Sequence, residues 1–251
     1  MVKSETDKLL ADRVEDFILA ATLRYQSKCT FFLDEREQAY CAKIAEKNGF
    51  HKYSLFGGYE NSQRRVFGVF DELTQPDENS FGITPITCTF ADFRTIAHRD
   101  FLGSLMGLGI KRECVGDILV GDGYAIIFVI NSILPVVMSE LRKVSTMGVK
   151  LEQGITKPLP AAYKLQPLEG TVSSLRLDCI TAMLTGQSRE KSTKLIASGL
   201  VFVNYVEQTN ISAVLKEKDV ITIRGEGKFI FDSVRYETKK GKLNILINKF
   251  V

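Results

Sequence analysis

The amino-acid sequence predicts an α+β protein with an N-terminal helical segment, a central domain with a mostly antiparallel sheet, and a smaller C-terminal domain. Three observations lead to this prediction. Apolar residues recur at helical spacing near the N-terminus, short apolar runs alternate with helical patterns in the middle, and two helical patterns followed by strands occupy 176–231. With 251 residues, 45% of them hydrophobic, the chain is long enough to form two or three cores.

The first segment, residues 1–50, is expected to be helical. Its apolar residues fall on one helical face, at Leu10, Val14, Phe17, Ile18 and Ala21. Asp34 is placed to cap a second helix, because acidic residues follow it in the first turn, where carboxylates suit the helix dipole. This segment offers no chemistry of its own.

The central domain is expected over 51–156. The pattern predicts strands and helices in alternation, with strands near 53–56, 66–70, 86–90, 118–120, 124–130 and 149–151, and helices near 100–108 and 133–144. This order is similar to the RNA-recognition-motif fold. The aromatic run Arg65–Phe70 resembles the RNA-stacking strand of that fold only loosely, so we interpret its rings as core residues.

A linker is expected over 157–170, because three of the six prolines of the chain lie there, at Pro158, Pro160 and Pro167. The C-terminal domain, 171–251, is basic, with 13 Lys and Arg against 8 Asp and Glu. The other 170 residues carry 20 Lys and Arg against 22 Asp and Glu. A basic domain on a near-neutral body is typical of proteins that bind a polyanion. Solvated lysines are the simpler interpretation of the charge alone.

Within the C-terminal domain, one helix is predicted from Leu177, Ile180, Thr181 and Leu184, which share a face. Ser188 is expected to cap a second helix and Gly199 to end it. Strands follow, and a hairpin is expected at the C-terminal end. The apolar residues close a small core, which leaves the basic side chains at the surface.

These residues resemble the S4-type RNA-binding domain. The match consists of Arg176-Leu177-Asp178, Ser188-Arg189, Leu195-Ile196 with Gly199, Val203-Asn204, Asp219, and Arg224-Gly225. Two positions depart from the pattern, since Tyr205 and Lys218 stand where that family has glycine. A type I′ turn needs positive φ at both central residues, so we expect strain at Tyr205 or a different turn.

The remainder of the chain resembles the bacterial YlmH family. The resemblance rests on Phe32–Gln38, Phe56–Glu60, His98–Gly103, Leu108–Glu113 and Gly116–Ile118, and on the C-terminal S4-type domain. It implies a ribosome-associated RNA-binding protein that acts in quality control of stalled large subunits with peptidyl-tRNA, and a link to cell division. The implied partners are large-subunit rRNA and peptidyl-tRNA, and we expect a cytoplasmic monomer.

The RNA-binding residues follow from this resemblance and from the basic pattern. Arginine pairs bidentately with phosphate, so we expect Arg176 and Arg189 to bind phosphates from the surface, near the starts of the two helices. The other expected contacts are Ser188, Lys191, Lys194, Arg224 and Lys228. A second RNA-binding patch is possible in the central domain, at Arg99, Lys111 and Arg112.

We predict no enzyme, no cofactor and no metal. The five cysteines are scattered without a C-x-x-C pair, and there are only two histidines. His98-Arg99-Asp100 matches a kinase tripeptide, but the other kinase motifs are missing, so helix capping is the favoured role. The most apolar stretch, 124–138, is too short to span a bilayer. The alternative is an RNA-modifying enzyme, similar to a pseudouridine synthase or a methyltransferase, whose S4-type domain docks its substrate.

Overall fold

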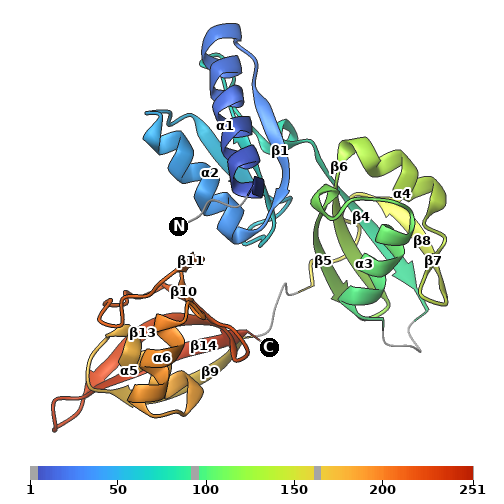
Figure 1. Ribbon diagram of the computed structural model, residues 1–251. Helices are drawn as coiled ribbons and strands as arrows, with labels where there is room; N and C mark the ends of the chain where they lie inside the picture. Colours follow the sequence, from blue (N-terminus) through green and yellow to red (C-terminus); the bar gives the residue numbers. More distant parts are fainter. Residues whose placement is uncertain (1–4, 92–95, 161–164, 251) are drawn as a thin grey trace. The chain divides into compact units, whose positions relative to one another are not determined.

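The computed structural model describes residues 5–91, 96–160 and 165–250 (Figure 1). The chain forms two compact units, Met1–Ala162 and Tyr163–Val251. Its described strands belong to three sheets, two in the first unit and one in the second. The fold is therefore α+β with antiparallel strand pairing throughout the sheets, as the sequence predicts.

The first unit begins with two helices on a small sheet. The elements are α1 (Glu5–Arg24), β1 (Lys28–Leu33), α2 (Glu35–Lys47), β2 (Tyr53–Phe56) and β3 (Arg65–Val69), and the strand order is β1-β3-β2. The predicted apolar face of α1 packs against this sheet through Val14, beside Phe67 and Cys41. Asp34 caps α2 as expected, in a reciprocal capping box with Glu37.

The expectation of a wholly helical 1–50 segment is wrong, because β1 lies inside it. Tyr25, with φ of +52°, follows α1 and turns the chain away from the helix. The apolar run of β1 then pairs with β3, so the expected boundary at 50/51 would divide a sheet. The helical period of the flanking residues dominates the pattern in 1–50, so the six-residue strand between the two helices leaves little local signal.

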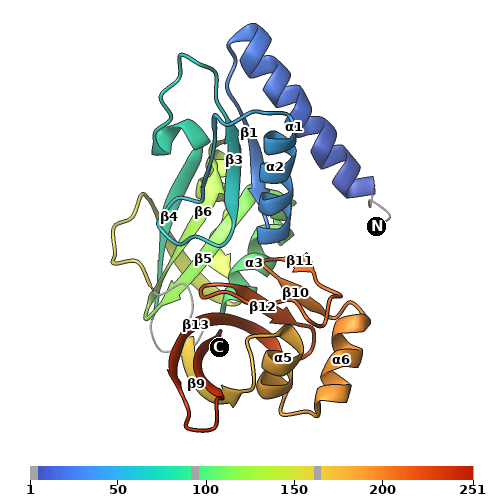
Figure 2. The same ribbon diagram turned by 90° about the vertical axis from the view of Figure 1, so that its left-hand side faces the viewer.

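The rest of the first unit has β-α-β-β-α-β connectivity (Figure 2). Its main elements are β4 (Ile83–Phe90), α3 (His98–Gly107), β5 (Val115–Gly121), β6 (Tyr124–Ile130), α4 (Leu134–Glu140) and β8 (Met147–Gln153), with a short β7 (Lys143–Val144) and 3-10 turns at Glu78–Phe81, Arg112–Cys114 and Asn131–Ile133. The sheet order is β5-β6-β4-β8-β7. The connectivity matches the split β-α-β arrangement that the sequence suggests, but β2 and β3 lie outside this sheet.

The loop between β2 and β3 is fastened to this second sheet. The Tyr59 hydroxyl and the backbone N–H of Gln63 both donate to Asp117 Oδ2 on β5, each at 2.7 Å. Gly58 has φ of +98°, and a Cβ atom there would lie 2.2 Å from the Phe128 ring. This close approach requires glycine at position 58.

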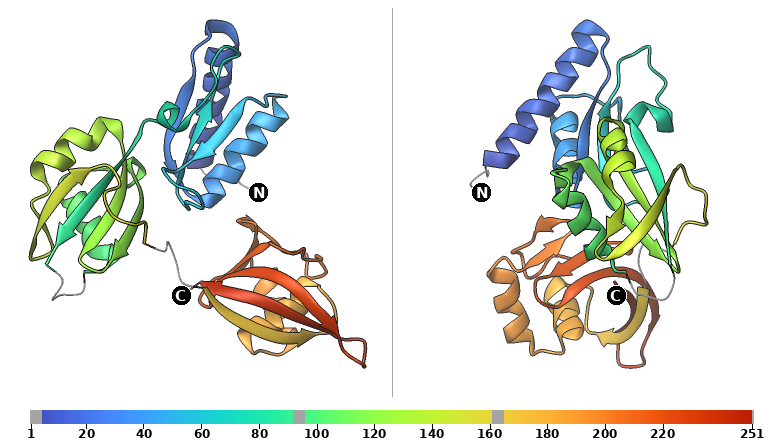
Figure 3. Two further views of the ribbon diagram at one scale, coloured as in Figure 1. Left: turned by 180° about the vertical axis from the view of Figure 1, so that it is seen from behind. Right: turned by 90° about the vertical axis from the view of Figure 1, so that its right-hand side faces the viewer.

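The second unit is one sheet with two helices on one of its faces (Figure 3). It contains β9 (Leu165–Val172), α5 (Leu177–Thr185), α6 (Arg189–Ala197), β10 (Val201–Val203), β11 (Val206–Glu207), β12 (Val220–Ile223), β13 (Gly227–Glu237) and β14 (Leu243–Phe250). The strand order is β11-β10-β12-β13-β14-β9. Leu177 and Ile180 of α5 and Ile196 of α6 pack on Ile221 and Phe231 of the sheet.

The expected linker, 157–170, is shorter in the structure. Its second half is β9, which pairs with β14 over Leu165–Val172. Pro167 fits there because β9 is an edge strand, where a missing backbone donor does not break the ladder. Residues 161–164 of the expected linker lie outside the described part of the chain.

The turns of the second unit follow the expected geometry. Gly199 has φ of +72° after α6, as a helix-ending glycine should. Asn204 and Tyr205 have φ of +48° and +66°, and Lys218 has +73°. The two residues that depart from the S4-type pattern therefore adopt the left-handed conformation that glycine would adopt without strain.

Candidate RNA-binding site

The starts of α5 and α6 bring three charged side chains together. Arg176 is the N-cap residue of α5, Asp178 lies in its first turn, and Arg189 is the first residue of α6. Ser188 caps α6 by accepting a hydrogen bond from the Lys191 amide, as predicted. Exposed donors at adjacent helix starts are suited to an anion.

Asp178 holds both arginines. Its Oδ1 accepts from Arg176 Nε at 3.1 Å, and its Oδ2 accepts from Arg189 Nη2 at 2.9 Å. The Asp178 side chain is only 5% exposed, whereas those of Arg176 and Arg189 are 38% and 57% exposed. The carboxylate is therefore an internal anchor, and each guanidinium keeps a face toward solvent.

Electrostatics favour the charged form of this group. Burial alone would raise the pKa of Asp178, but the hydrogen bonds from Arg176 and Arg189 outweigh burial and place it below the ordinary value. The hydrogen bond to Asp178 in turn raises the pKa of Arg189. Because two cations share one carboxylate, the cluster carries a net positive charge.

This geometry corrects one expectation. From the sequence, Arg176 and Arg189 are expected at the surface and outside the core, so charge reversal of both with Glu is expected to change stability little. Replacing both with Glu would instead place two carboxylates beside a buried one, and like charges at this distance destabilise. The two arginines are thus both structural partners of Asp178 and candidate phosphate ligands.

The remaining predicted residues of this unit are more dispersed. Lys191 and Lys194 are exposed on α6, and Lys194 pairs with Glu190 at 2.8 Å, a surface contact of small energy. Arg224 lies over the Phe202 ring, 5.1 Å from its centroid. Lys228 Nζ lies 4.9 Å from the Tyr205 centroid and 4.8 Å from that of Phe250.

The second predicted patch is only partly a surface. Arg99 and Lys111 are exposed, but Arg112 is half-buried and its guanidinium donates to the carbonyl oxygens of Val115 and Gly116. Burial lowers the pKa of Arg112 to about 10, and the nearby Arg64 adds to this shift. Arg112 therefore has a structural role, which the sequence does not indicate.

The kinase-like tripeptide has the expected capping role. It opens α3, where Asp100 Oδ2 accepts from the Ala97 amide at 2.8 Å. Within the residues that the structure describes, no group of three His, Cys, Asp or Glu side chains is placed to hold a metal ion. None of the described helices is both long enough and apolar enough to cross a bilayer.

Comparisons with known proteins place the chain in a family. The model described as "Putative RNA-binding domain in YlmH" matches residues 76–157, the part with β-α-β-β-α-β connectivity. The ribosome-associated protein quality control protein P2 of Bacillus subtilis (strain 168) is 32% identical over 228 residues, which are 90% of this chain and 88% of that protein. The chain belongs to the YlmH family.

A solved structure has a similar fold. The cell division protein ylmH from Streptococcus pneumoniae matches with a TM-score of 0.53 at 22% identity, over 62% of this chain and 93% of that one. At this identity the match concerns the fold. The matched family model and the Bacillus relative together support an RNA-binding role for this YlmH family member.

Proposed function

We propose that this protein binds structured rRNA and tRNA on the large ribosomal subunit, without catalysis, through a C-terminal S4-type domain. The observation that carries the proposal is the arginine pair on Asp178, with both guanidinium groups presented at adjacent helix starts. Arginine so held loses little side-chain entropy when it binds a phosphate, because its rotamer is already fixed.

The cellular role is proposed from the family. The Bacillus relative is named for ribosome-associated quality control, so we propose that this chain acts in the cytoplasm on stalled large subunits that retain peptidyl-tRNA. The solved relative is named for cell division, and we regard that as a consequence of the same ribosomal role. A monomer is sufficient for this function.

The rival proposal is an RNA-modifying enzyme whose catalytic site lies in the first unit. Its strongest candidate is the group of Tyr59, Arg64, Arg112 and Asp117, where polar side chains converge. Both oxygens of Asp117 accept backbone amides, from Gln63 and Arg64, and Arg64 donates to the carbonyl oxygen of Phe32. Groups committed to such contacts hold the unit together, which favours the binding protein.

The test measures affinity for a structured RNA against salt concentration. For the wild type, the log–log slope should be steep, about −0.7 to −0.9 for each phosphate contact. Arg189→Gln should weaken binding about tenfold or more and flatten the slope by roughly one contact, because a charged hydrogen bond is lost.

Arg235→Gln is the matched control. Arg235 lies on β13 of the same unit, is 50% exposed, and forms a long ion pair with Glu169 at 3.6 Å. The substitution removes the same charge and should leave the slope unchanged. Equal losses of RNA affinity in the two variants would mean that binding depends only on the net charge of the unit, and would contradict the proposed site.

A further inference from the structure

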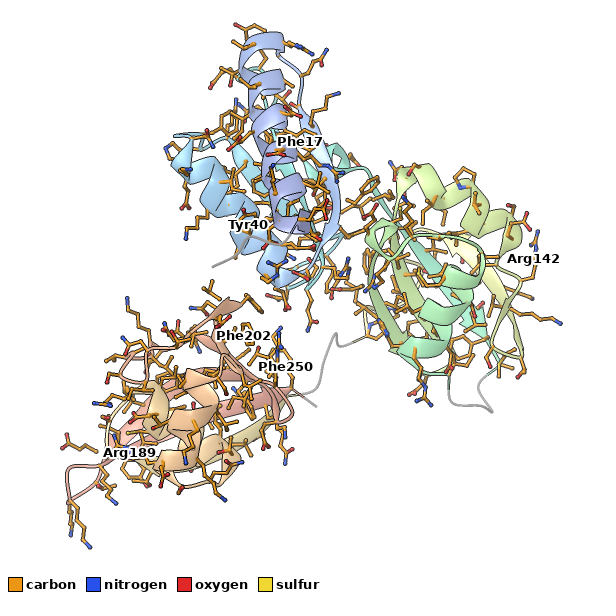
Figure 4. All side chains as sticks on the ribbon, in the orientation of Figure 1. Phe17, Tyr40, Arg142, Arg189, Phe202 and Phe250 are labelled. Carbon is orange, nitrogen blue, oxygen red and sulfur yellow. The ribbon has the colours of Figure 1, made fainter. Side chains whose placement is uncertain are left out.

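The face of the C-terminal sheet opposite α5 and α6 carries aromatic rings and cations. We define the cation–aromatic face as Phe202, Tyr205, Arg224, Lys228 and Phe250. Figure 3 shows this side of the sheet, and Figure 4 labels Phe202 and Phe250 on a different part of the unit from Arg189. The face is thus separate from the arginine pair described above.

Strand register explains why these residues share a face. Phe202 on β10 pairs with Thr222 on β12, and Thr222 pairs with Lys228 on β13. Phe229 pairs with Lys249, so Lys228 and Phe250 come side by side on the next strands. Their neighbours in sequence, among them Ile221, Ile223 and Phe229, are buried toward the helices, so the alternate residues must face the other way.

The rings do not serve the core. Phe202, Tyr205 and Phe250 are partly exposed, and within the described residues none of them belongs to the hydrophobic cluster of this unit. A cation lies over each ring instead, at 4.8 to 5.1 Å between the charge and the ring centroid. Glu207, opposite Phe202 in the register, directs its carboxylate toward Gly199.

Tyr205 gives an independent indication that the face has a function. It stands at the second central position of the β10–β11 turn with φ of +66°, where glycine is preferred and a bulky side chain is rare. Strained residues of this kind are concentrated at binding sites. Here the strained position places an aromatic ring next to Lys228.

We propose that the cation–aromatic face binds unpaired RNA nucleotides, with bases stacked on Phe202 and Phe250 and phosphates paired with Arg224 and Lys228. Aromatic rings accept any base, and adjacent cations supply the charge complementary to the backbone. Phe202 and Phe250 are three strand spacings apart, about 14 Å. Neighbouring bases in a helix are separated by only about 3.4 Å, so the rings suit splayed bases rather than a duplex.

This inference rests on the proposed RNA-binding function and adds a second contact to it. The arginine pair would bind phosphates of a structured RNA, whereas the cation–aromatic face would bind nucleotides that extend from it. The experiment therefore compares, with the full-length protein, a blunt RNA hairpin and the same hairpin with a single-stranded extension that contains 2-aminopurine.

For the wild type, the extension should increase affinity about tenfold, and 2-aminopurine fluorescence should be quenched by stacking. Phe202→Leu and Phe250→Leu should each reduce both effects, and the double variant should bind the two RNAs equally. Affinity for the blunt hairpin should be unchanged. Tyr236→Leu, which removes a ring that is 58% exposed elsewhere on β13, is the matched control and should behave as the wild type.

Equal wild-type affinity for the two hairpins would overturn the inference and assign the face to another occupant, such as a protein. Undiminished quenching in the double variant would also overturn it. Circular dichroism checks that each variant folds, and Lys228→Gln, which leaves the rings in place, should reduce the effect of the extension as well. Failure of Arg189→Gln to weaken hairpin binding would count against the proposed function alone.

Discussion

At the residue scale, Asp178 determines where two arginine side chains lie. A single buried carboxylate accepts hydrogen bonds from Arg176 and Arg189, which are 13 positions apart in the sequence. The helix starts themselves follow from local signals, since Ser188 and Gly199 sit where capping rules place them. The hydrogen bonds that join both arginines to Asp178 do not follow from local signals, because the approach of Arg189 to α5 depends on how the two helices pack.

The first residue-scale prediction concerns acid. The pKa of folded Asp178 lies below its unfolded value of about 3.9, so its contribution to stability is present above that pH and is lost as the pH falls through the folded pKa. Asp178→Asn should reduce the free energy of unfolding by about 1.5–3 kcal/mol near neutral pH, because charge-assisted hydrogen bonds are weakened.

Denaturant titrations at several pH values measure this effect. The difference between wild type and Asp178→Asn should be constant from pH 8 to 5. It should shrink as the pH falls below about 4, because the carboxylate is then protonated in the unfolded chain while it is still ionised and paired in the folded one. If the difference in the free energy of unfolding is the same at pH 2 as at pH 7, the charge of the carboxylate contributes nothing to stability, and only the shape of the side chain matters at this position.

At the scale of elements, short strands were harder to predict than helices. The strand β1 occupies six residues between two helices, and β9 contains Pro167, which favours a linker when only local preference is considered. Both are strands because of distant partners, β3 and β14. Pairing between segments far apart in the sequence leaves little local signal.

The loop between β2 and β3 supports a prediction at this scale. Gly58→Ala should destabilise the first unit by about 1–3 kcal/mol, because the added Cβ atom meets the Phe128 ring and the backbone has positive φ. Gly103→Ala is the control, since nothing lies within 4 Å of a Cβ atom there and alanine favours the α3 helix. Circular dichroism during thermal unfolding gives the melting temperatures of the two variants. Equal melting temperatures for Gly58→Ala and Gly103→Ala would show that the loop rearranges to accommodate the added methyl group at no cost in stability.

At the scale of the whole molecule, the uneven charge follows the division into units. The basic residues that the sequence singles out at 176–228 all lie in the second unit, Tyr163–Val251. The match to the RNA-binding family model instead covers 76–157, in the first unit. Both units are therefore expected to contribute to RNA binding, and the arginine pair is the part whose chemistry is most sharply defined.

Co-sedimentation with large ribosomal subunits tests the central claim most directly. The informative variant is Arg176→Gln/Asp178→Asn/Arg189→Gln, because it removes the pair without leaving an unpaired buried carboxylate. We predict that the wild type and Arg235→Gln pellet with the subunits, and that the folded triple variant stays in the supernatant at physiological salt. A folded triple variant that pellets as fully as the wild type would contradict the account.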